Sequence, residues 1–264
     1  MFSIGIMQGR VLPFDLKKIQ VYPTDSYIDE LIRIEKLGFD YVELLFDRKM
    51  QYRKYLSEVK KQIDDMDLSC VSICADNLTN FSCLNNIEQF SNMIKKNIEE
   101  ASEMGINRVI VPFFGANQIS TQEEFQIVLL GLVERGVLRQ AHSKTISLCL
   151  ETELTANDMK RILLSNKLRE FKICYDLGNA QALGYDILKE IDILGFMIGH
   201  VHIKDCQLAG PNVLLGEGDV DFESALKALK KVRYPGPLIL ETKYFESAEN
   251  EAKNNLEYIN SKLG

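Results

Sequence analysis

The chain alternates short apolar runs with longer amphipathic segments, and it does so eight times in 264 residues. The apolar runs have the length of buried parallel strands and are rich in Ile, Val and Leu. Strands that alternate with helices pair in parallel through right-handed crossovers, so this pattern restricts the fold strongly. We expect strands at residues 3–8, 40–46, 68–75, 107–113, 146–151, 171–176, 198–204 and 237–242.

The segments between the strands show helical periodicity. Residues 26–37 are apolar at positions i, i+3, i+4 and i+7 and stop at Gly38, and residues 85–104 repeat the pattern before Gly105. Asp221 is a favourable N-cap for the helix that follows it. The other expected helices cover residues 48–66, 121–142, 156–166, 187–194, 222–232 and 247–263.

Eight strand–helix units are the number that closes a TIM barrel. We therefore expect the α/β class and a single (β/α)8 barrel, with residues 1–264 forming one domain. An open doubly wound sheet is the alternative. Such a sheet usually has fewer units, and its glycine-rich turn would follow the first strand, where QGRVLP stands instead.

Composition argues against several classes of partner. The net charge is −7 and the basic residues are scattered, which disfavours nucleic acid. No apolar stretch approaches the roughly 18 residues of a membrane helix, and the N-terminal MFSIGIMQGR lacks the basic segment of a signal peptide. We expect a cytoplasmic protein. Its six cysteines form no CxxC pair and are expected to be reduced and mostly buried.

In TIM barrels, chemistry lies at the carboxyl ends of the strands. The last four strands end in or carry Glu151, Asp176, His202 and Glu241. Three carboxylates and an imidazole at neighbouring strand ends would repel one another without a cation, so we predict one divalent metal ion. The oxygen-rich set suits Mn²⁺, Mg²⁺ or Co²⁺, and Zn²⁺ is less typical of it. His200 lies two residues before His202. It is expected to help position His202 without binding the metal itself.

Each of these residues also has a structural interpretation. Glu151 could be a helix cap or a surface charge, and Asp176 could cap the segment that starts at residue 178. His202 could be a core histidine with satisfied hydrogen bonds. Glu241 could pair with a nearby lysine.

Five further polar residues lie at or near strand ends. Gln8 and Glu43 are candidates for binding sugar hydroxyls, and Arg10 and Lys243 for binding an anionic group. Lys204 has the same strand parity as His202 and should point inward. It could bind a phosphate or carboxylate, stabilise an enolate, or form a salt bridge with a neighbouring carboxylate.

Several segments carry a resemblance that spans nearly the whole chain. The chain resembles the xylose-isomerase-like TIM-barrel superfamily, which includes sugar-phosphate isomerases and epimerases, ketose 3-epimerases, inosose dehydratases and endonuclease IV. The matching segments, in chain order, are GIMQGR (5–10), LGFDYVEL (37–44), LCLET (148–152), YDLGNA (175–180), HVHIKD (200–205), LLGEGDVDF (214–222) and LILET (238–242).

The resemblance implies roles for particular residues. The four predicted ligands match the metal ligands of the superfamily, and Glu151 and Glu241 match the pair that moves protons in ketose epimerases. Two positions depart from that pattern: Asn179 stands where the epimerases commonly carry a histidine, and Leu208 where they carry an arginine. Asn179 can still hydrogen-bond a sugar hydroxyl. Barrels of this group often form dimers or tetramers, so a homo-oligomer is compatible with the resemblance.

These observations predict an enzyme acting on a small carbohydrate. The expected reaction is isomerisation or epimerisation of a sugar, sugar phosphate or related keto-polyol, by proton transfer next to a carbonyl through an enediolate. The alternatives are a dehydratase of an inosose-like keto-polyol and a barrel that only binds a ligand. A zinc endonuclease is disfavoured because its cluster needs about five histidines. This chain has only His142, His200 and His202, and Phe114 stands at the strand-four position where that family would place a histidine.

Overall fold

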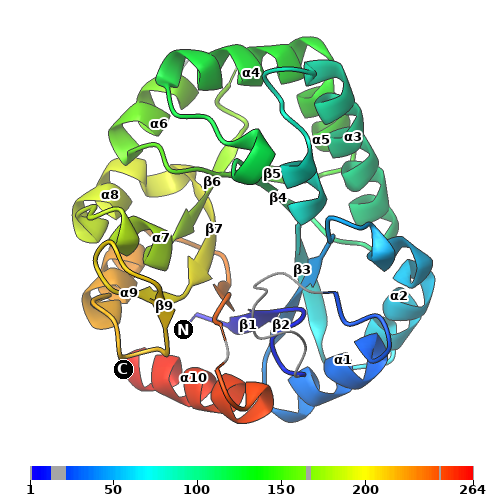
Figure 1. Cartoon of the computed structure of the whole chain (residues 1–264), viewed down its shortest axis with the longest axis vertical. Helices are drawn as coiled ribbons and strands as arrows, with labels where there is room; N and C mark the ends of the chain where they lie inside the picture. Colours follow the sequence, from blue (N-terminus) through cyan, green and yellow to red (C-terminus); the bar gives the residue numbers. More distant parts are fainter. Residues whose placement is uncertain (1, 13–21, 165–167, 244, 264) are drawn as a thin grey trace.

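The strands of the computed structural model form a closed parallel barrel (Figure 1). The structure describes residues 2–12, 22–164, 168–243 and 245–263. The barrel order is β1-β10-β7-β6-β5-β4-β3-β2, which confirms the expected TIM barrel. Its strands are β1 (Ile4–Met7), β2 (Tyr41–Leu45), β3 (Ser69–Cys74), β4 (Arg108–Pro112), β5 (Ser147–Glu151), β6 (Lys172–Asp176), β7 (Ile198–Ile203) and β10 (Leu238–Leu240).

The α-helices form a ring outside the strands (Figure 1). They are α1 (Tyr27–Lys36), α2 (Leu56–Asp64), α3 (Ile87–Glu103), α4 (Gln122–Glu134), α5 (Val137–Ser143), α6 (Ala156–Leu163), α7 (Leu177–Ala182), α8 (Ile187–Leu194), α9 (Phe222–Lys231) and α10 (Ala248–Lys262). The described residues also form the short 3₁₀ helices η1 (Gln51–Lys54), η2 (Asp76–Asn80), η3 (Gly115–Asn117) and η4 (Gly195–Met197). No helix in the described part of the chain is both long and apolar enough to cross a bilayer.

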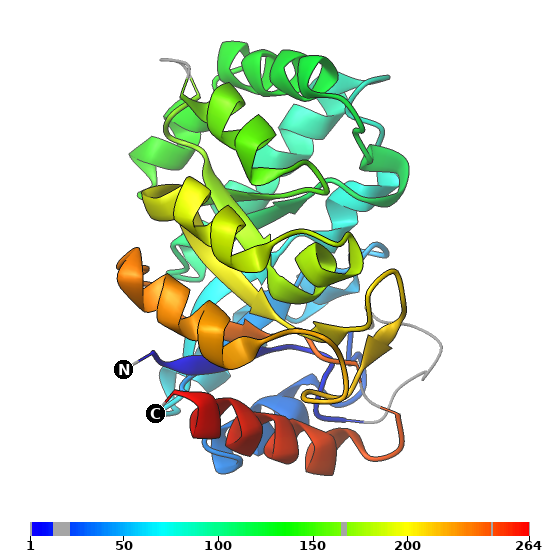
Figure 2. The same ribbon diagram turned by 90° about the vertical axis from the view of Figure 1, so that its left-hand side faces the viewer.

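Strand register places the predicted ligands at one level of the barrel. Asp176 on β6 is the register partner of His202 on β7, and His202 is in turn the partner of Ile239 on β10. Glu151 is the last residue of β5, and Glu241 directly follows β10. Because all these strands are parallel, their carboxyl ends open at the same mouth, toward the right in Figure 2.

The helices depart from expectation at three places. The single helix expected over residues 121–142 was wrong: it is divided into α4 and α5 by Gly136, whose φ of +75° breaks the helical path. The helix expected over residues 48–66 is likewise divided, into η1 and α2. The short helix α7 was not expected, although Asp176 caps it as one interpretation proposed, accepting a hydrogen bond from the backbone N–H of Asn179 at 2.9 Å.

A small hairpin beside the mouth was also missed. It consists of β8 (Asp205–Cys206) and β9 (Asn212–Val213), and it lies at the end toward which the barrel strands point (Figure 2). The Asp205 carboxylate accepts hydrogen bonds from the backbone N–H groups of Cys206, Gly216, Gly218 and Val220, at 2.9 to 3.2 Å. A Cβ atom at Gly218 would collide with this carboxylate, so only glycine fits there.

Apolar side chains fill the space between strands and helices and the lower barrel interior. Phe113, which follows β4, packs against Phe90 of α3 and Phe125 of α4, at ring-centroid distances of 5.9 and 4.7 Å. Inside the barrel, Met7 and Ile239 belong to a separate buried cluster. All six cysteines are free thiols, and five are fully buried, as expected.

Candidate metal centre

Four side chains from consecutive strand ends converge at the mouth of the barrel. Glu151, Asp176, His202 and Glu241 each place one potential ligand atom within 4.8 Å of the others. The three carboxylates are only 5% exposed and the imidazole is completely buried. Nδ1 of His202 faces the carboxylates, at 3.3 Å from Oε2 of Glu241 and 3.7 Å from Oε1 of Glu151. The structure therefore brings together the whole predicted ligand set.

Within the described part of the chain, Lys204 and Arg10 bring positive charge to this cluster. Nζ of Lys204 lies 2.6 Å from Oδ2 of Asp176 and 3.3 Å from Oε2 of Glu241. Nη2 of Arg10 lies 4.0 Å from Oε1 of Glu241. Lys204 thus forms the salt bridge that was one of its predicted roles.

These cations do not fully offset the repulsion among the three buried carboxylates. Burial raises the pKa of Asp176 to about 7; the Lys204 ammonium opposes this rise, and the carboxylates of Glu241 and Glu151 add to it. A carboxyl group that resists ionisation among other buried carboxylates indicates a site where further positive charge is stabilising. Three carboxylates and one imidazole nitrogen at this spacing fit a divalent cation that prefers oxygen ligands.

The other edge of the His202 ring contacts a buried glutamate. Nε2 of His202 is hydrogen-bonded to Oε1 of Glu43 at 2.8 Å. The second oxygen of Glu43 accepts a hydrogen bond from the Ser72 hydroxyl at 2.6 Å and lies 2.8 Å from Nε2 of His200. Both Glu43 oxygens are thus engaged inside the barrel. The carboxylate predicted to bind a sugar hydroxyl instead contacts the histidines and the serine.

The remaining predicted residues surround the mouth. Asn179 donates from its side-chain amide to Oε1 of Glu151 at 3.3 Å. Gln8 is completely buried and its side-chain oxygen accepts from the backbone N–H of Leu45. Lys243 is half-buried, and its ammonium lies 5.5 Å from the centre of the Phe245 ring.

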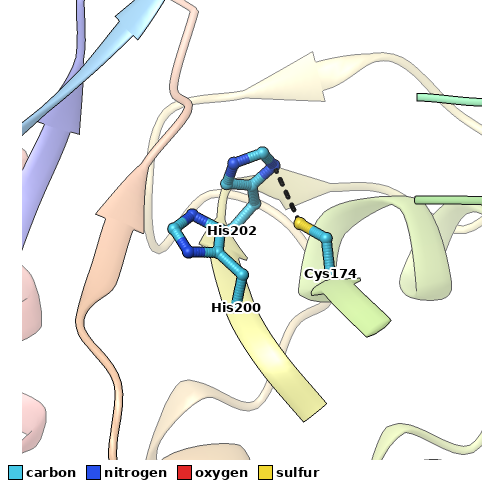
Figure 3. A group of neighbouring side chains, drawn as sticks. All are labelled: Cys174, His200 and His202. Carbon is cyan, nitrogen blue, oxygen red and sulfur yellow. Dashed lines mark hydrogen bonds between the residues drawn. The ribbon is translucent and has the colours of Figure 1, made fainter. Parts of the chain in front are cut away.

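Sequence reasoning missed three residues that support the site. Ser72 and Cys174 are inward-facing side chains on β3 and β6; the Cys174 thiol lies 3.6 Å from Nδ1 of His202 (Figure 3). A polar residue at an inward position of an apolar strand was the available signal for Ser72. Glu30 of α1 accepts hydrogen bonds from the backbone N–H groups of Gly9 and Val11, the residues flanking Arg10. Its sequence context is that of an ordinary helix-surface charge and offered no signal.

A closed βα barrel with four buried side chains at its mouth that could ligate a metal defines a TIM-barrel protein with a candidate divalent-metal centre. The chain belongs to the family described as xylose isomerase-like TIM barrel, whose model matches residues 31–262. This confirms the resemblance inferred from the sequence.

Characterised relatives in this family include sugar epimerases. The L-ribulose-5-phosphate 3-epimerase UlaE of Escherichia coli (strain SMS-3-5 / SECEC) is 26% identical over 270 residues, covering 93% of this chain and 92% of the relative. Among solved structures, an IOLI protein with a bound zinc atom superposes with a TM-score of 0.77 at 17% identity, covering 99% of this chain and 98% of the other. An L-ribulose 3-epimerase superposes with a TM-score of 0.76 at 18% identity, covering 100% and 95%.

Proposed function

We propose that this chain is a divalent-metal-dependent epimerase that moves a proton on the carbon next to the carbonyl of a ketose or ketose phosphate. The observation that carries the proposal is the pair of buried carboxylates, Glu151 and Glu241, within one four-residue cluster at the mouth. Two carboxyl groups beside one bound sugar can act on opposite faces of the same carbon. The 3-epimerase activity named for the UlaE relatives supports the choice of epimerisation.

Glu151, Asp176, His202 and Glu241 would hold the metal ion. When bound, the ion supplies Lewis acidity that stabilises negative charge on the oxygens of the reacting sugar. The set of ligand types suits Mn²⁺, Mg²⁺ or Co²⁺ better than Zn²⁺, because three of its four members are carboxylates.

Proton transfer is assigned to the two glutamates. One carboxylate takes the proton from the carbon next to the carbonyl, and the bonding electrons pass to the carbonyl oxygen, which gives an enediolate. The other carboxyl group, protonated at this stage, returns a proton to the opposite face of the same carbon. An aldose–ketose shift would use only one of the two groups.

The surrounding polar residues would orient the sugar. Asn179 contacts Glu151 directly, so a hydroxyl bound by its amide would lie beside the proton-transfer carboxylate. Gln8 is a second candidate for a hydroxyl. Arg10 and Lys243 are candidates for an anionic group such as a phosphate, and Lys204 for keeping Asp176 and Glu241 in place.

The experiment is hydrogen exchange in D₂O. The Mn²⁺-loaded protein is incubated with L-ribulose 5-phosphate, L-ribulose, other ketoses and an inosose, and the products are analysed by NMR and mass spectrometry. Deuterium incorporation at the carbon next to the carbonyl without loss of water is the expected result. Loss of water would instead establish the dehydratase alternative. A protein that binds no metal and exchanges none of these substrates would refute the proposal.

A further inference from the structure

The carboxylate of Glu43 crosses the barrel interior to reach the candidate ligand His202. Glu43 lies on β2, and His202 lies on β7, which is three strands away around the barrel. The two residues are 159 positions apart in the sequence, yet Oε1 of Glu43 and Nε2 of His202 are 2.8 Å apart, and both side chains are completely buried. A charged group buried this deeply is costly unless its partners satisfy it.

The partners of Glu43 satisfy both of its oxygens. Ser72 donates to Oε2 at 2.6 Å, and Nε2 of His200 lies 2.8 Å from the same atom. The position of the Glu43 carboxylate is therefore set by three side chains from two strands.

The hydrogen bond to Glu43 determines which nitrogen of His202 carries a proton. The Glu43 carboxylate accepts from Ser72 and, as an acceptor, takes the hydrogen bond from Nε2 of His202, so a neutral ring carries its proton on Nε2. Nδ1 is left to face Glu151 and Glu241, at 3.7 and 3.3 Å, which is the direction of the candidate metal. In Figure 3 this nitrogen is the one joined to Cys174 by the dashed line.

We propose that Glu43 is a positioning residue that keeps the proton of His202 on Nε2 and so presents Nδ1 to the metal ion. The proposal rests on the metal site of the proposed function and assigns Glu43 a role away from the substrate. Carboxylates that hydrogen-bond the outer nitrogen of a metal-binding histidine orient the ring and raise its basicity, and their loss commonly costs 10- to 100-fold in metal affinity. Ser72 and His200 act through Glu43 by holding its second oxygen.

A different arrangement would use Cys174, His200 and His202 as the ligand set, since their donor atoms also lie within 4.8 Å of one another. The contacts disfavour it. Nε2 of His200 lies 2.8 Å from Oε2 of Glu43, which occupies the space beside this nitrogen. Sγ of Cys174 lies 3.6 Å from Nδ1 of His202, and a thiol must lose its proton to bind a metal ion. A metal ion at the carboxylate cluster requires neither a new contact for His200 nor the loss of the Cys174 proton.

The first test is NMR of the unmodified protein labelled with ¹⁵N-histidine, titrated with Zn²⁺ as a diamagnetic probe. With only three histidines in the chain, the signals can be assigned by replacing His142 and His200 one at a time. The expected result is that Nδ1 of His202 moves to a metal-bound shift while Nε2 stays protonated and His200 changes little. Coordination through Nε2 would overturn the proposal, as would coordination by both His200 and His202.

The second test measures Mn²⁺ affinity by titration calorimetry in Glu43→Gln, Ser72→Ala and the control Glu100→Gln. Glu100 is another mostly buried glutamate, but it contacts Tyr52 and Arg53 outside the barrel. We expect the dissociation constant to rise about 10- to 100-fold in Glu43→Gln, to rise less in Ser72→Ala, and to stay within about twofold in Glu100→Gln. Folded Glu43→Gln with wild-type affinity would overturn the proposal.

These results are distinguishable from failure of the proposed function. If the Mn²⁺-loaded wild-type protein exchanges no substrate, the epimerase proposal fails while the His202 signals and the Mn²⁺ affinities still test Glu43. If Glu43→Gln does not fold, the Zn²⁺ titration of the unmodified protein and the Ser72→Ala affinity decide the question without it.

Discussion

The ammonium of Lys204 lies 2.6 Å from Oδ2 of Asp176, inside the same group of carboxylates that we assign to a metal ion. Lys204 directly follows β7 and Asp176 ends β6, so two neighbouring strands form this contact. The pairing means that a protein cation already neutralises part of the cluster. Stability should therefore depend on Lys204 most strongly when no metal is bound.

Replacing Lys204 tests this dependence. Lys204→Met keeps the length of the side chain but leaves buried carboxylates without the ammonium, so the free energy of unfolding of the metal-free protein should fall by about 3–5 kcal/mol. The loss should be smaller in Mn²⁺, because the ion supplies positive charge to the same oxygens. Chemical denaturation with and without Mn²⁺ measures both values. Equal losses under the two conditions would contradict the assignment, and Lys243→Met is the matched control.

Loss of one proton-transfer carboxylate should stop turnover. Glu151→Gln retains the size of the side chain but cannot take up a proton, so we expect kcat for deuterium exchange to fall by about 10²-fold or more. The circular dichroism spectrum should be unchanged. Glu170→Gln, an exposed position just before β6 at the opposite end of the barrel, serves as the control. Wild-type exchange by Glu151→Gln would remove this residue from the mechanism.

Metal removal should destabilise the protein and abolish activity reversibly. A ligand present at 100 times its dissociation constant stabilises the folded state by about 2.7 kcal/mol. We therefore expect Mn²⁺ or Co²⁺ to raise the melting temperature of chelator-treated protein and to restore exchange activity. The double variant Asp176→Asn/His202→Ala lacks two of the four ligands and should show no such rise. Equal stabilisation of this variant would place the metal elsewhere.

Glu30 predicts a pH dependence of stability that a single substitution removes. Burial raises its pKa from 4.5 to about 7, against the opposing hydrogen bonds from Gly9 and Val11. Between these two values the folded protein keeps the proton that the unfolded chain has lost, so this group lowers stability as pH rises from about 4.5 to 7. At about 1.4 kcal/mol per pKa unit, the full effect has an upper limit of about 3.5 kcal/mol.

The variant Glu30→Gln is neutral at every pH and keeps an oxygen to accept both backbone hydrogen bonds. Relative to the wild type, its unfolding free energy should increase between pH 4.5 and 7 and level off above that range. Urea denaturation across this pH range measures the difference. A difference that stays constant with pH would show that Glu30 has the same pKa in the folded and unfolded protein.

Local sequence patterns predicted most of the barrel because its strands are buried runs that alternate with helices. The four candidate ligands were found by asking which polar residues end those runs. The position of Asp176 at the end of such a run also suggested that it caps the next helix. The break at Gly136 was not predictable in this way, since apolar periodicity continues on both sides of it. The two helices are separated at Gly136, whose backbone φ angle is +75°.

The contacts behind the ligands could not be read from local patterns at all. An inward direction for Glu43 follows from its place on a strand, but its partners come from strands elsewhere around the barrel. Which side chains meet across the interior depends on how strand register closes the barrel. For that reason Glu43 was expected at the substrate, whereas its carboxylate lies against His202 and His200.

The four hydrogen bonds that Asp205 accepts join the loop of residues 206–220 to the strand that carries His202. A designer who wished to change the substrate of this barrel would have little freedom in that loop. Insertions there would pull on the end of β7 and disturb the candidate ligand geometry before they altered any sugar contact. New specificity is better sought by substitution at Arg10 and Lys243, after β1 and β10, which leaves the Asp205 contacts intact.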